Sequence, residues 1–199
     1  MRMLDAGEEL FGEKGFEDAP VSEIVARADA SVGSFYRRFK DKDGLLQAVH
    51  ERFCEEARIT TDKALAPERW ADSTIEEMAG SFIQFLIAIF HERAGLFRSF
   101  IVRSERDPIV RERTNGLYDY LAEKLAFLLR ARGVQTRRND EIFGARFALM
   151  MVTGFLTEVV LVRESKLSLT DPRVAESLTY GFLSYLGIKT DDFTQEKSK

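Results

Sequence analysis

The sequence predicts an all-α protein, and three observations lead to that prediction. Apolar residues recur at helical spacing along most of the chain, as Val32, Phe35 and Phe39 do. Residues that favour helix starts, such as Asp and Ser, precede these stretches, and Gly follows several of them. No segment shows the alternation of apolar and polar residues that is typical of a strand. With 199 residues, 45% of them hydrophobic, the chain can bury a sizeable core.

The charge composition restricts the way in which the protein can bind nucleic acid. The formal net charge is −4, so such binding requires a local basic patch. Arg37, Arg38, Lys40 and Lys42 supply a patch of this kind within six positions. The single cysteine, Cys54, excludes an intrachain disulfide and suits a reducing compartment.

We expect a cytoplasmic protein without a membrane partner. The first residues lead directly into an acidic amphipathic segment, and no signal peptide is visible. The longest charge-poor run, residues 147–162, contains Glu158 and is too short and too polar to span a membrane.

Two other classes of protein are weighed against a DNA-binding protein. An enzyme is disfavoured because His50 and His91 fall on different predicted helices, and because no glycine-rich phosphate loop or nucleophile motif is present. We therefore expect no catalysis, no cofactor and no metal site. A helical adaptor that binds only protein would leave the basic stretch 31–42 unexplained.

The first 66 residues predict four helices in order. The first ends at residues 14–15 (Lys-Gly), and Pro20 occupies the first position of the second. Ser31 caps a third, short helix, and Asp41 caps a fourth that extends to about residue 66. Two short helices joined by a tight turn and braced by a helix on each side constitute a helix-turn-helix.

This region resembles the DNA-binding domain of the TetR (tetracycline-repressor-like, TetR/AcrR) transcriptional regulators. The resemblance covers residues 3–50 at the family's spacing without a gap. It is carried by Met3, Leu4, Asp5, Ala6, Leu10, Phe11, Lys14, Gly15, Phe16, Val21, Ile24, Val25, Ala28, Ser31, Gly33, Phe35, Tyr36, Phe39, Lys42, Leu45, Leu46, Gln47, Ala48 and Val49. It implies a DNA-binding domain at residues 1–46 and a helical effector-binding and dimerisation domain at residues 47–199.

The resemblance also implies that residues 32–38 form a recognition helix in the major groove. Tyr36 and Lys42 would then contact phosphates, and the neighbouring small and basic residues would approach bases. The DNA-binding residues expected in this way are Ser31, Val32, Gly33, Ser34, Tyr36, Arg37, Arg38, Lys40 and Lys42.

The chain shows three departures from the family pattern. Val32 stands where Lys is common, and a helical wheel buries it, whereas the family pattern turns it toward DNA and a thymine methyl group. Residues 19–20 (Ala-Pro) replace a hydroxyl that could cap near the phosphates. Asp29 stands where Gly is usual, which predicts a left-handed backbone conformation. Of the basic arm that many relatives carry, only Arg2 is present.

The rest of the chain predicts five more helices, at about residues 73–92, 96–102, 107–132, 140–163 and 171–187, followed by a polar tail. The helix at 140–163 is apolar on almost every side, so each side must be covered. We interpret one side as interior and another as an interface with a second subunit, with a purely internal core as the alternative. The last helix would complete a four-helix dimer interface with Val174, Leu178, Gly181, Phe182 and Tyr185.

Aromatic and apolar residues of the second half predict an effector pocket, since such pockets are mostly apolar with a few polar groups. The predicted lining is Phe82, Phe85, Phe97, Phe100, Arg103, Tyr118, Phe147, Met151, Phe155 and Glu158, with His91 and Thr153 as further polar candidates. Each Phe has ordinary core packing as its alternative. Glu158 either binds a ligand group, pairs with a buried arginine such as Arg146 or Arg103, or faces water at the interface.

The sequence thus predicts a homodimeric transcriptional regulator that binds a double-stranded DNA operator. We expect a repressor that a small, largely apolar effector releases from DNA, through a shift of population toward an arrangement that binds DNA poorly.

Overall fold

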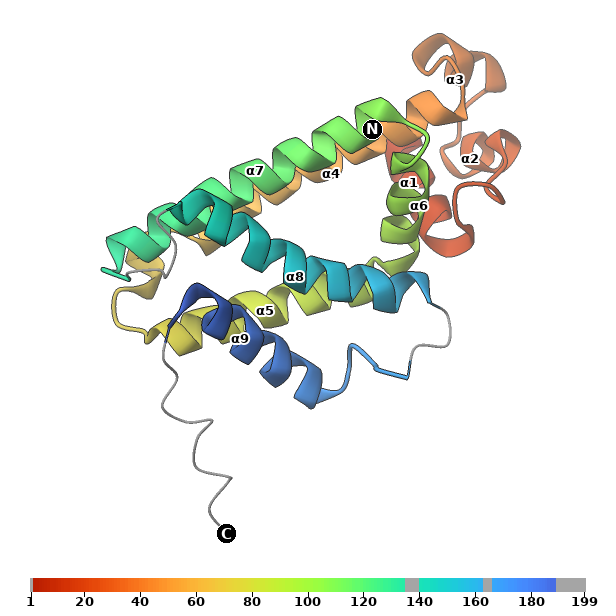
Figure 1. Ribbon diagram of the computed structural model, residues 1–199. Helices are drawn as coiled ribbons and strands as arrows, with labels where there is room; N and C mark the ends of the chain where they lie inside the picture. The colour runs from red at the N-terminus through yellow and green to blue at the C-terminus, as the bar shows by residue number, and fades with distance from the viewer. Residues whose placement is uncertain (1, 135–139, 163–165, 189–199) are drawn as a thin grey trace. The chain divides into compact units, whose positions relative to one another are not determined.

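A computed structural model of the chain describes residues 2–134, 140–162 and 166–188, and it confirms the all-α prediction (Figure 1). The predicted polar tail lies outside the described residues, apart from its first residue. The helices are α1 (Arg2–Lys14), α2 (Val21–Arg27), α3 (Val32–Arg38), α4 (Lys42–Ala64), η1 (Pro67–Trp70), α5 (Ile75–Glu92), α6 (Ala94–Ser104), α7 (Pro108–Ala131), α8 (Glu141–Leu161) and α9 (Pro172–Leu186). Only the short 3₁₀ helix η1 was not predicted.

Side-chain caps begin the helices where the sequence predicts them. The Ser31 hydroxyl accepts the Ser34 amide at 3.1 Å, and Asp41 Oδ1 accepts the Gly44 amide at 2.8 Å. Asp140 and Asp171 likewise accept amides in the first turns of α8 and α9. One detail was wrong: Pro20 is the extended residue before α2 and not its first helical residue. These caps satisfy amides that have no partner within the helix.

The described chain divides into two compact units. Unit 1 comprises residues 1–57 and 92–116, and unit 2 comprises residues 58–91 and 117–199. Helices α4 and α7 each contribute residues to both units. Unit 1 is therefore larger than the predicted DNA-binding domain at 1–46, because it adds residues 47–57 of α4, the helix α6 and the first turns of α7.

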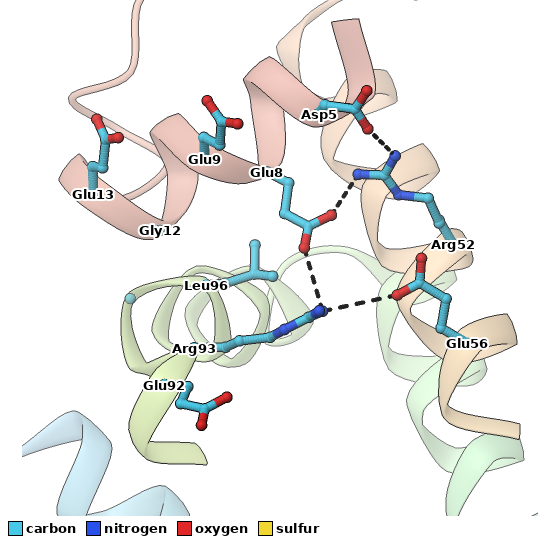
Figure 2. A pocket seen from close by; sticks show the side chains of 11 residues that line it. Asp5, Glu8, Glu9, Gly12, Glu13, Arg52, Glu56, Glu92, Arg93 and Leu96 are labelled. Atoms are coloured by element: carbon cyan, nitrogen blue, oxygen red, sulfur yellow. Dashed lines mark hydrogen bonds and ion pairs between the residues drawn. The ribbon is translucent and has the colours of Figure 1, made fainter. Parts of the chain in front are cut away.

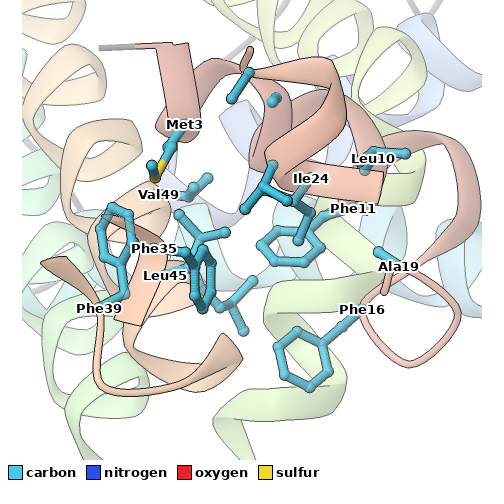
Figure 3. Packing of buried hydrophobic residues seen from close by; sticks show 14 of the residues in the cluster. Met3, Leu10, Phe11, Phe16, Ala19, Ile24, Phe35, Phe39, Leu45 and Val49 are labelled. Carbon is cyan, nitrogen blue, oxygen red and sulfur yellow. The ribbon is translucent and has the colours of Figure 1, made fainter. Parts of the chain in front are cut away.

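One hydrophobic cluster holds unit 1 together (Figure 3). Phe11 and Phe35 are fully buried in it, and the rings of Phe11 and Phe16 lie 5.5 Å apart. Helix α6 adds Leu96 and Phe100 to the same cluster. Burying a Phe side chain contributes on the order of 2 kcal/mol, so these aromatic residues account for much of the stability of the helix-turn-helix.

Helices α1 and α6 meet at two glycines. A Cβ added to Gly95 would overlap the carbonyl oxygen of Gly12, so the two backbones are in direct contact there. The Ser99 hydroxyl donates to the Phe11 carbonyl at 3.2 Å in the same contact. The absence of a side chain at residue 95 is therefore a requirement of the packing.

His50 joins three helices inside unit 1. Its imidazole lies 3.1 Å from the Thr114 hydroxyl of α7 and 4.8 Å from the Phe100 ring of α6, and it is almost fully buried. Burial, with the nearby Arg113 as a second cause, lowers the pKa of His50 to about 4. The ring is therefore neutral at pH 7 and acts as a hydrogen-bonded core residue.

Unit 2 is built around α8, which packs along α9 (Figure 1). The rings of Phe82 on α5 and Phe182 on α9 lie 6.4 Å apart in its interior. Arg132 at the end of α7 binds the carbonyls of Trp70 and Ser73 and so holds η1. Among the described helices, α8 alone is long and apolar enough to cross a membrane, a property that core helices of globular proteins share.

We expect Gly95→Ala to lower the free energy of unfolding by about 3 kcal/mol, because the added methyl group forces α1 and α6 apart. Gly80→Ala is the matched control, since a Cβ on Gly80 of α5 meets no atom within 4 Å. That change should raise stability by about 0.5–1 kcal/mol, because Ala favours the helix. Urea unfolding followed by circular dichroism measures both; equal stabilities for the two variants would contradict the close contact.

Candidate nucleic-acid interface

Helix α3 is held by one face and exposed on the other. Phe35 is fully buried, and its ring lies 5.6 Å from that of Phe39, which follows the helix. The exposed face carries Val32, Tyr36 and Arg37. The burial of the two aromatic rings thus orients a small, aromatic and basic surface toward solvent.

Val32 corrects the helical wheel, which placed it in the buried stripe. Its side chain is 49% exposed, in agreement with the alternative that the family pattern offered. The wheel failed because α3 is only seven residues long, so one buried residue and the residue that follows the helix suffice to anchor it.

Asp29 confirms the prediction of a left-handed backbone in the turn between α2 and α3, with a φ of 49°. Its carboxylate lies 3.3 Å from the guanidinium of Arg2, but both side chains are largely exposed. Such a pair contributes little to stability. The turn therefore adopts the conformation that glycine would favour, at a small cost.

Carboxylates neutralise many of the basic side chains of unit 1. Arg27 pairs with Glu13 at 2.8 Å, and Lys14 pairs with Glu23 at 2.7 Å. Further pairs engage Arg52, Arg93, Arg103 and Arg113. Within the described residues, Arg37, Arg38 and Lys40 form no ion pair. An acidic protein thereby keeps a local positive surface at the end of α3, as contact with phosphates requires.

Lys42 has partners that the sequence did not reveal. Its ammonium group donates to the carbonyl oxygens of Phe16 at 2.6 Å and Glu17 at 3.0 Å, and it lies 4.5 Å from the centre of the Phe16 ring. These contacts attach the loop after α1 to the start of α4. The predicted phosphate contact therefore has to compete with a structural role for the same side chain.

Arg103 lies in the same cluster and corrects its assignment to the effector pocket. Its guanidinium pairs with Asp43 and lies 4.6 Å from the centre of the Phe16 ring. Phe16 thus contacts two cations, Lys42 and Arg103, an arrangement that cation–π attraction favours. The cluster connects α6 to the helix-turn-helix within unit 1.

The other predicted pocket residues are divided between the two units. Phe97 and Phe100 lie in unit 1 and pack on Phe53, at ring distances of 5.3 and 5.6 Å. Unit 2 contains Phe82, Phe85, Tyr118, Phe147, Met151, Phe155 and Glu158. The set therefore does not form one pocket within either unit, because α6 packs on α1.

Several of the predicted pocket residues in unit 2 are exposed and so do not line its interior. Phe85, Phe147, Met151 and Glu158 are exposed. The exposure of Glu158 favours the alternative that it faces water, and Arg146 pairs with Asp119 instead. Phe82 is buried, and Tyr118 and Phe155 are partly buried.

Tyr118 and Thr153 form a polar pair inside unit 2. A hydrogen bond joins their side chains, and burial raises the pKa of the Tyr118 hydroxyl. The buried Thr153 hydroxyl also donates to the Leu149 carbonyl at 2.9 Å. This pair is the polar feature that remains of the predicted pocket, whereas His91 is exposed.

Of the residues predicted for the dimer interface, some are buried within the subunit and others are partly exposed. Val174 is buried, and Phe182 is 1% exposed against Phe82 within the same subunit, so neither can line a surface for a partner. Leu178, Gly181 and Tyr185 are partly exposed on α9. Helix α9 does carry the predicted apolar stripe, but two of its residues, Val174 and Phe182, belong to the interior of unit 2.

Unit 1 also contains an open pocket of about 640 Å³ that the sequence did not predict (Figure 2). Arg93 lies 3.3 Å from Glu8 and 3.9 Å from Glu56, and Arg52 lies 2.5 Å from Asp5. Because these carboxylates already bind arginines, the pocket is a polar network that joins α1, α4 and α6. Among the described residues, no group of three His, Cys, Asp or Glu side chains is placed to hold a metal ion.

A short helix that exposes unpaired basic and aromatic side chains, within a braced helix-turn-helix, is the arrangement with which helix-turn-helix proteins contact the major groove of DNA. Residues 3–49 match the family model described as "Bacterial regulatory proteins, tetR family". Residues 3–49 are therefore similar to the DNA-binding domain of the TetR family of transcriptional regulators. This family consists of regulatory proteins that bind DNA.

Similarity to an individual protein agrees with the match to the family model. Over 50 residues the chain is 38% identical to YvdT, an uncharacterized HTH-type transcriptional regulator of Bacillus subtilis (strain 168). That stretch covers 25% of this chain and 26% of YvdT, so the match is confined to about a quarter of either protein.

Two solved structures share the fold over nearly the whole chain. FadR of Bacillus subtilis, in complex with stearoyl-CoA, has a TM-score of 0.66 and 19% identity, over 93% of this chain and 98% of that one. A transcriptional regulator of Saccharomonospora viridis, in complex with choline, has a TM-score of 0.71 and 15% identity, over 92% and 94%. At these identities the comparison establishes the fold alone.

We expect Lys42→Ala to lower the free energy of unfolding by about 2 kcal/mol, since two carbonyls lose a charged donor. Tyr36→Ala and Arg37→Ala should leave stability within about 0.5 kcal/mol, because both side chains are exposed. Both should weaken DNA binding, and Arg37→Ala should reduce the salt slope by about one unit. Urea unfolding and fluorescence anisotropy at several salt concentrations measure these effects. A Lys42→Ala protein with parental stability and a reduced slope would restore the predicted phosphate contact.

Proposed function

We propose that the protein is a homodimeric transcriptional regulator in which α3 of each subunit enters the major groove of an operator. In this proposal it represses transcription and is released from DNA by a small, largely apolar effector. Residues 1–46 supply the DNA-contacting surface, and residues 47–199 supply dimerisation and effector binding. The protein acts in the cytoplasm, where its operator DNA is.

The observation that carries the DNA-binding part is the unpaired basic end of α3, in a unit where carboxylates pair with many of the other basic side chains. Arg37, Arg38 and Lys40 are exposed, and they adjoin the exposed ring of Tyr36. A surface that combines cations with a phenol can contact several phosphates at once. The match of residues 3–49 to the family model supports the same function.

An exposed apolar face of α8 supports the homodimer. Phe143, Phe147 and Met150 recur at helical spacing on that face and are all exposed. The Phe147 ring stacks on Tyr185 of α9 at 4.8 Å, which extends the face onto the second helix. Gly154 lies on the same side, and a Cβ there would meet no atom within 4 Å. A second copy of the chain would bury this face, whereas isolated subunits would leave it in water.

Phe147→Glu should convert the protein to a monomer that keeps its helical content. The side chain is 44% exposed in the subunit, so the carboxylate remains hydrated there, whereas burial in a dimer costs several kcal/mol. Phe127→Glu is the matched control, because Phe127 of α7 is 57% exposed in the same unit. Sedimentation velocity and circular dichroism measure both variants. A dimeric Phe147→Glu protein would place the interface elsewhere.

DNA binding requires the dimer in this proposal. Two recognition helices must reach half-sites about one helical turn apart, so a monomer loses most of its affinity. The test is selection of bound sequences from random duplexes, followed by gel shifts with the parent and Phe147→Glu proteins. Enrichment of a palindromic site that the parent binds and the monomer does not would support the function. No enrichment of any sequence would refute it.

The interior of unit 2 supports an apolar effector. Phe82, Tyr118 and Phe155 offer aromatic surface, and the Tyr118–Thr153 pair offers a hydroxyl group. Stearoyl-CoA in FadR has a long apolar chain, whereas choline is a small cation, so the shared fold permits different ligand chemistry. The aromatic composition of this interior favours the apolar class for this protein.

A thermal-shift screen should find stabilisation by aromatic acids or acyl compounds, because a ligand that binds the folded state raises the melting temperature. Phe155→Ala should reduce this shift without changing ligand-free DNA binding, since Phe155 belongs to unit 2. Phe127→Ala, which removes an exposed ring, should keep the parental shift. Stabilisation by phosphorylated metabolites alone would refute the apolar effector.

A further inference from the structure

Asp29 adopts a backbone conformation that its side chain does not favour. Among the residues that the structure describes, it is the one non-glycine residue with a positive φ, whereas Gly15, Gly133 and Gly187 occupy the other positions of this kind. Glycine adopts this conformation without a steric cost. An aspartate at such a turn therefore points to a use for its carboxylate, since residues in unfavourable conformations concentrate at functional sites.

The carboxylate of Asp29 does not support the turn itself. Within the described residues it accepts one hydrogen bond, from Arg2 Nη1 to Asp29 Oδ2 at 3.3 Å. Main-chain bonds hold the turn instead, because the Asp29 amide donates to the Ala26 carbonyl and the Ala30 amide donates to the Val25 carbonyl. The side chain is 92% exposed, so packing does not require it either.

The pair of Arg2 with Asp29 is not needed to attach α1 to α2. The hydrophobic cluster of unit 1 already includes side chains of both helices. Arg27 of α2 also binds Glu13 of α1 at 2.8 Å, and the Arg27 side chain is less exposed than that of Arg2. Exposed ion pairs contribute little to stability, so the Arg2 guanidinium can exchange Asp29 for another anion at a small cost.

This pair lies beside the start of α3. Asp29 precedes Ser31, the N-cap of α3, by two residues, and two residues of chain span at most about 7 Å. Charges at that distance act on phosphates that contact the helix, because the Debye length is about 10 Å at 0.1 M salt. Arg37, Arg38 and Lys40 place unpaired positive charge at the other end of α3. At the start of α3, a cation and a carboxylate instead neutralise each other.

We propose that Asp29 competes with DNA for Arg2 and thereby limits the affinity of the protein for any duplex. The inference rests on the proposed function, because the start of α3 must approach DNA for the competition to occur. Without the carboxylate, the Arg2 guanidinium would bind a phosphate oxygen, an acceptor that suits its fork of donors. Since every duplex offers phosphates, the limit does not depend on base sequence.

A limited affinity suits a regulator that an effector must release. An effector changes the affinity for DNA only by the coupling free energy between the two sites. Each additional phosphate contact would add to the affinity that this coupling has to overcome. The carboxylate of Asp29 thus keeps one cation of each subunit out of the DNA contact.

Asp29→Asn tests the proposal, because it removes the charge and keeps a residue that tolerates the left-handed conformation. At about 0.1 M salt, the full-length variant should bind the duplex selected from random DNA about threefold to tenfold more tightly than the parent, since each subunit of a dimer loses one weak pair. An unrelated duplex of equal length should show the same gain. The salt slope should steepen by about one unit per subunit. Fluorescence anisotropy at several salt concentrations measures both.

Arg2→Gln supplies the readout that a purely structural role of Asp29 would not change. In the parent, Arg2→Gln should leave the salt slope unaltered, because Asp29 already holds this cation. In the Arg2→Gln background, Asp29→Asn should no longer steepen the slope, because there is no cation to release. The two substitutions are therefore coupled in a double-mutant cycle.

Glu112→Gln is the matched control for net charge. Glu112 is exposed on α7 of the same unit, and its substitution removes one negative charge, as Asp29→Asn does. This variant should keep the parental salt slope. Asp29→Gly should raise the melting temperature, because glycine relieves the turn, and should give the same gain in DNA binding as Asp29→Asn.

Each outcome supports or overturns the competition between Asp29 and DNA. An Asp29→Asn protein with the affinity and salt slope of a DNA-binding parent overturns it. A steeper slope that persists in the Arg2→Gln background overturns it as well, since the carboxylate then acts without Arg2. A gain with Asp29→Gly alone assigns the effect to the backbone. If the parent binds no duplex, the proposed function itself fails.

Discussion

The packing of α6 against α1 is the contact on which the arrangement of unit 1 depends. The backbones are in contact at Gly12 and Gly95, so there is no room for a side chain at residue 95. This contact places Leu96 and Phe100 in the same core as Phe11. It also brings Arg103 to Phe16 and Asp43, at the junction of the helix-turn-helix with α4. The helix-turn-helix is consequently folded as one body with α6, although some fifty residues of chain separate them.

Charge pairing complements this packing. Within unit 1, carboxylates engage arginines of α2, α4, α6 and α7, and these pairs connect neighbouring helices. Individually, exposed pairs of this kind contribute little to stability. Their collective effect is electrostatic, because they leave the end of α3 as the unpaired basic surface described above. A protein with an acidic composition can thus still present a positive surface to a polyanion.

Unit 2 has aromatic side chains both in its interior and on the exposed face of α8. Phe82 and Phe182 fill the interior, whereas Phe143, Phe147 and Met150 remain exposed. A helix that is apolar on nearly all sides is stable in water only when each of its faces is buried. The interior of unit 2 buries one face of α8, and a partner subunit would bury the exposed face. The Tyr118–Thr153 pair shows that the interior of unit 2 also accommodates polar groups when they bind one another.

The sequence by itself determined the helices and the family of the DNA-binding domain, because those signals are local. Ser31, Asp41, Asp140 and Asp171 cap helices through bonds to residues two or three positions away, and Asp29 adopts its φ within a single turn. Local periodicity likewise identified Phe35 and Phe39 as the anchors of α3.

Tertiary structure decided which partners distant residues choose. Lys42 binds carbonyls 25 and 26 residues away, and Arg103 binds Asp43 across 60 residues. An aromatic residue such as Phe100 or Phe182 has the same hydrophobicity whether it lines a pocket, an interface or a core. Which of these it does depends on the faces that α6 and α9 turn toward their neighbours, and the spacing of residues along one helix does not contain that information.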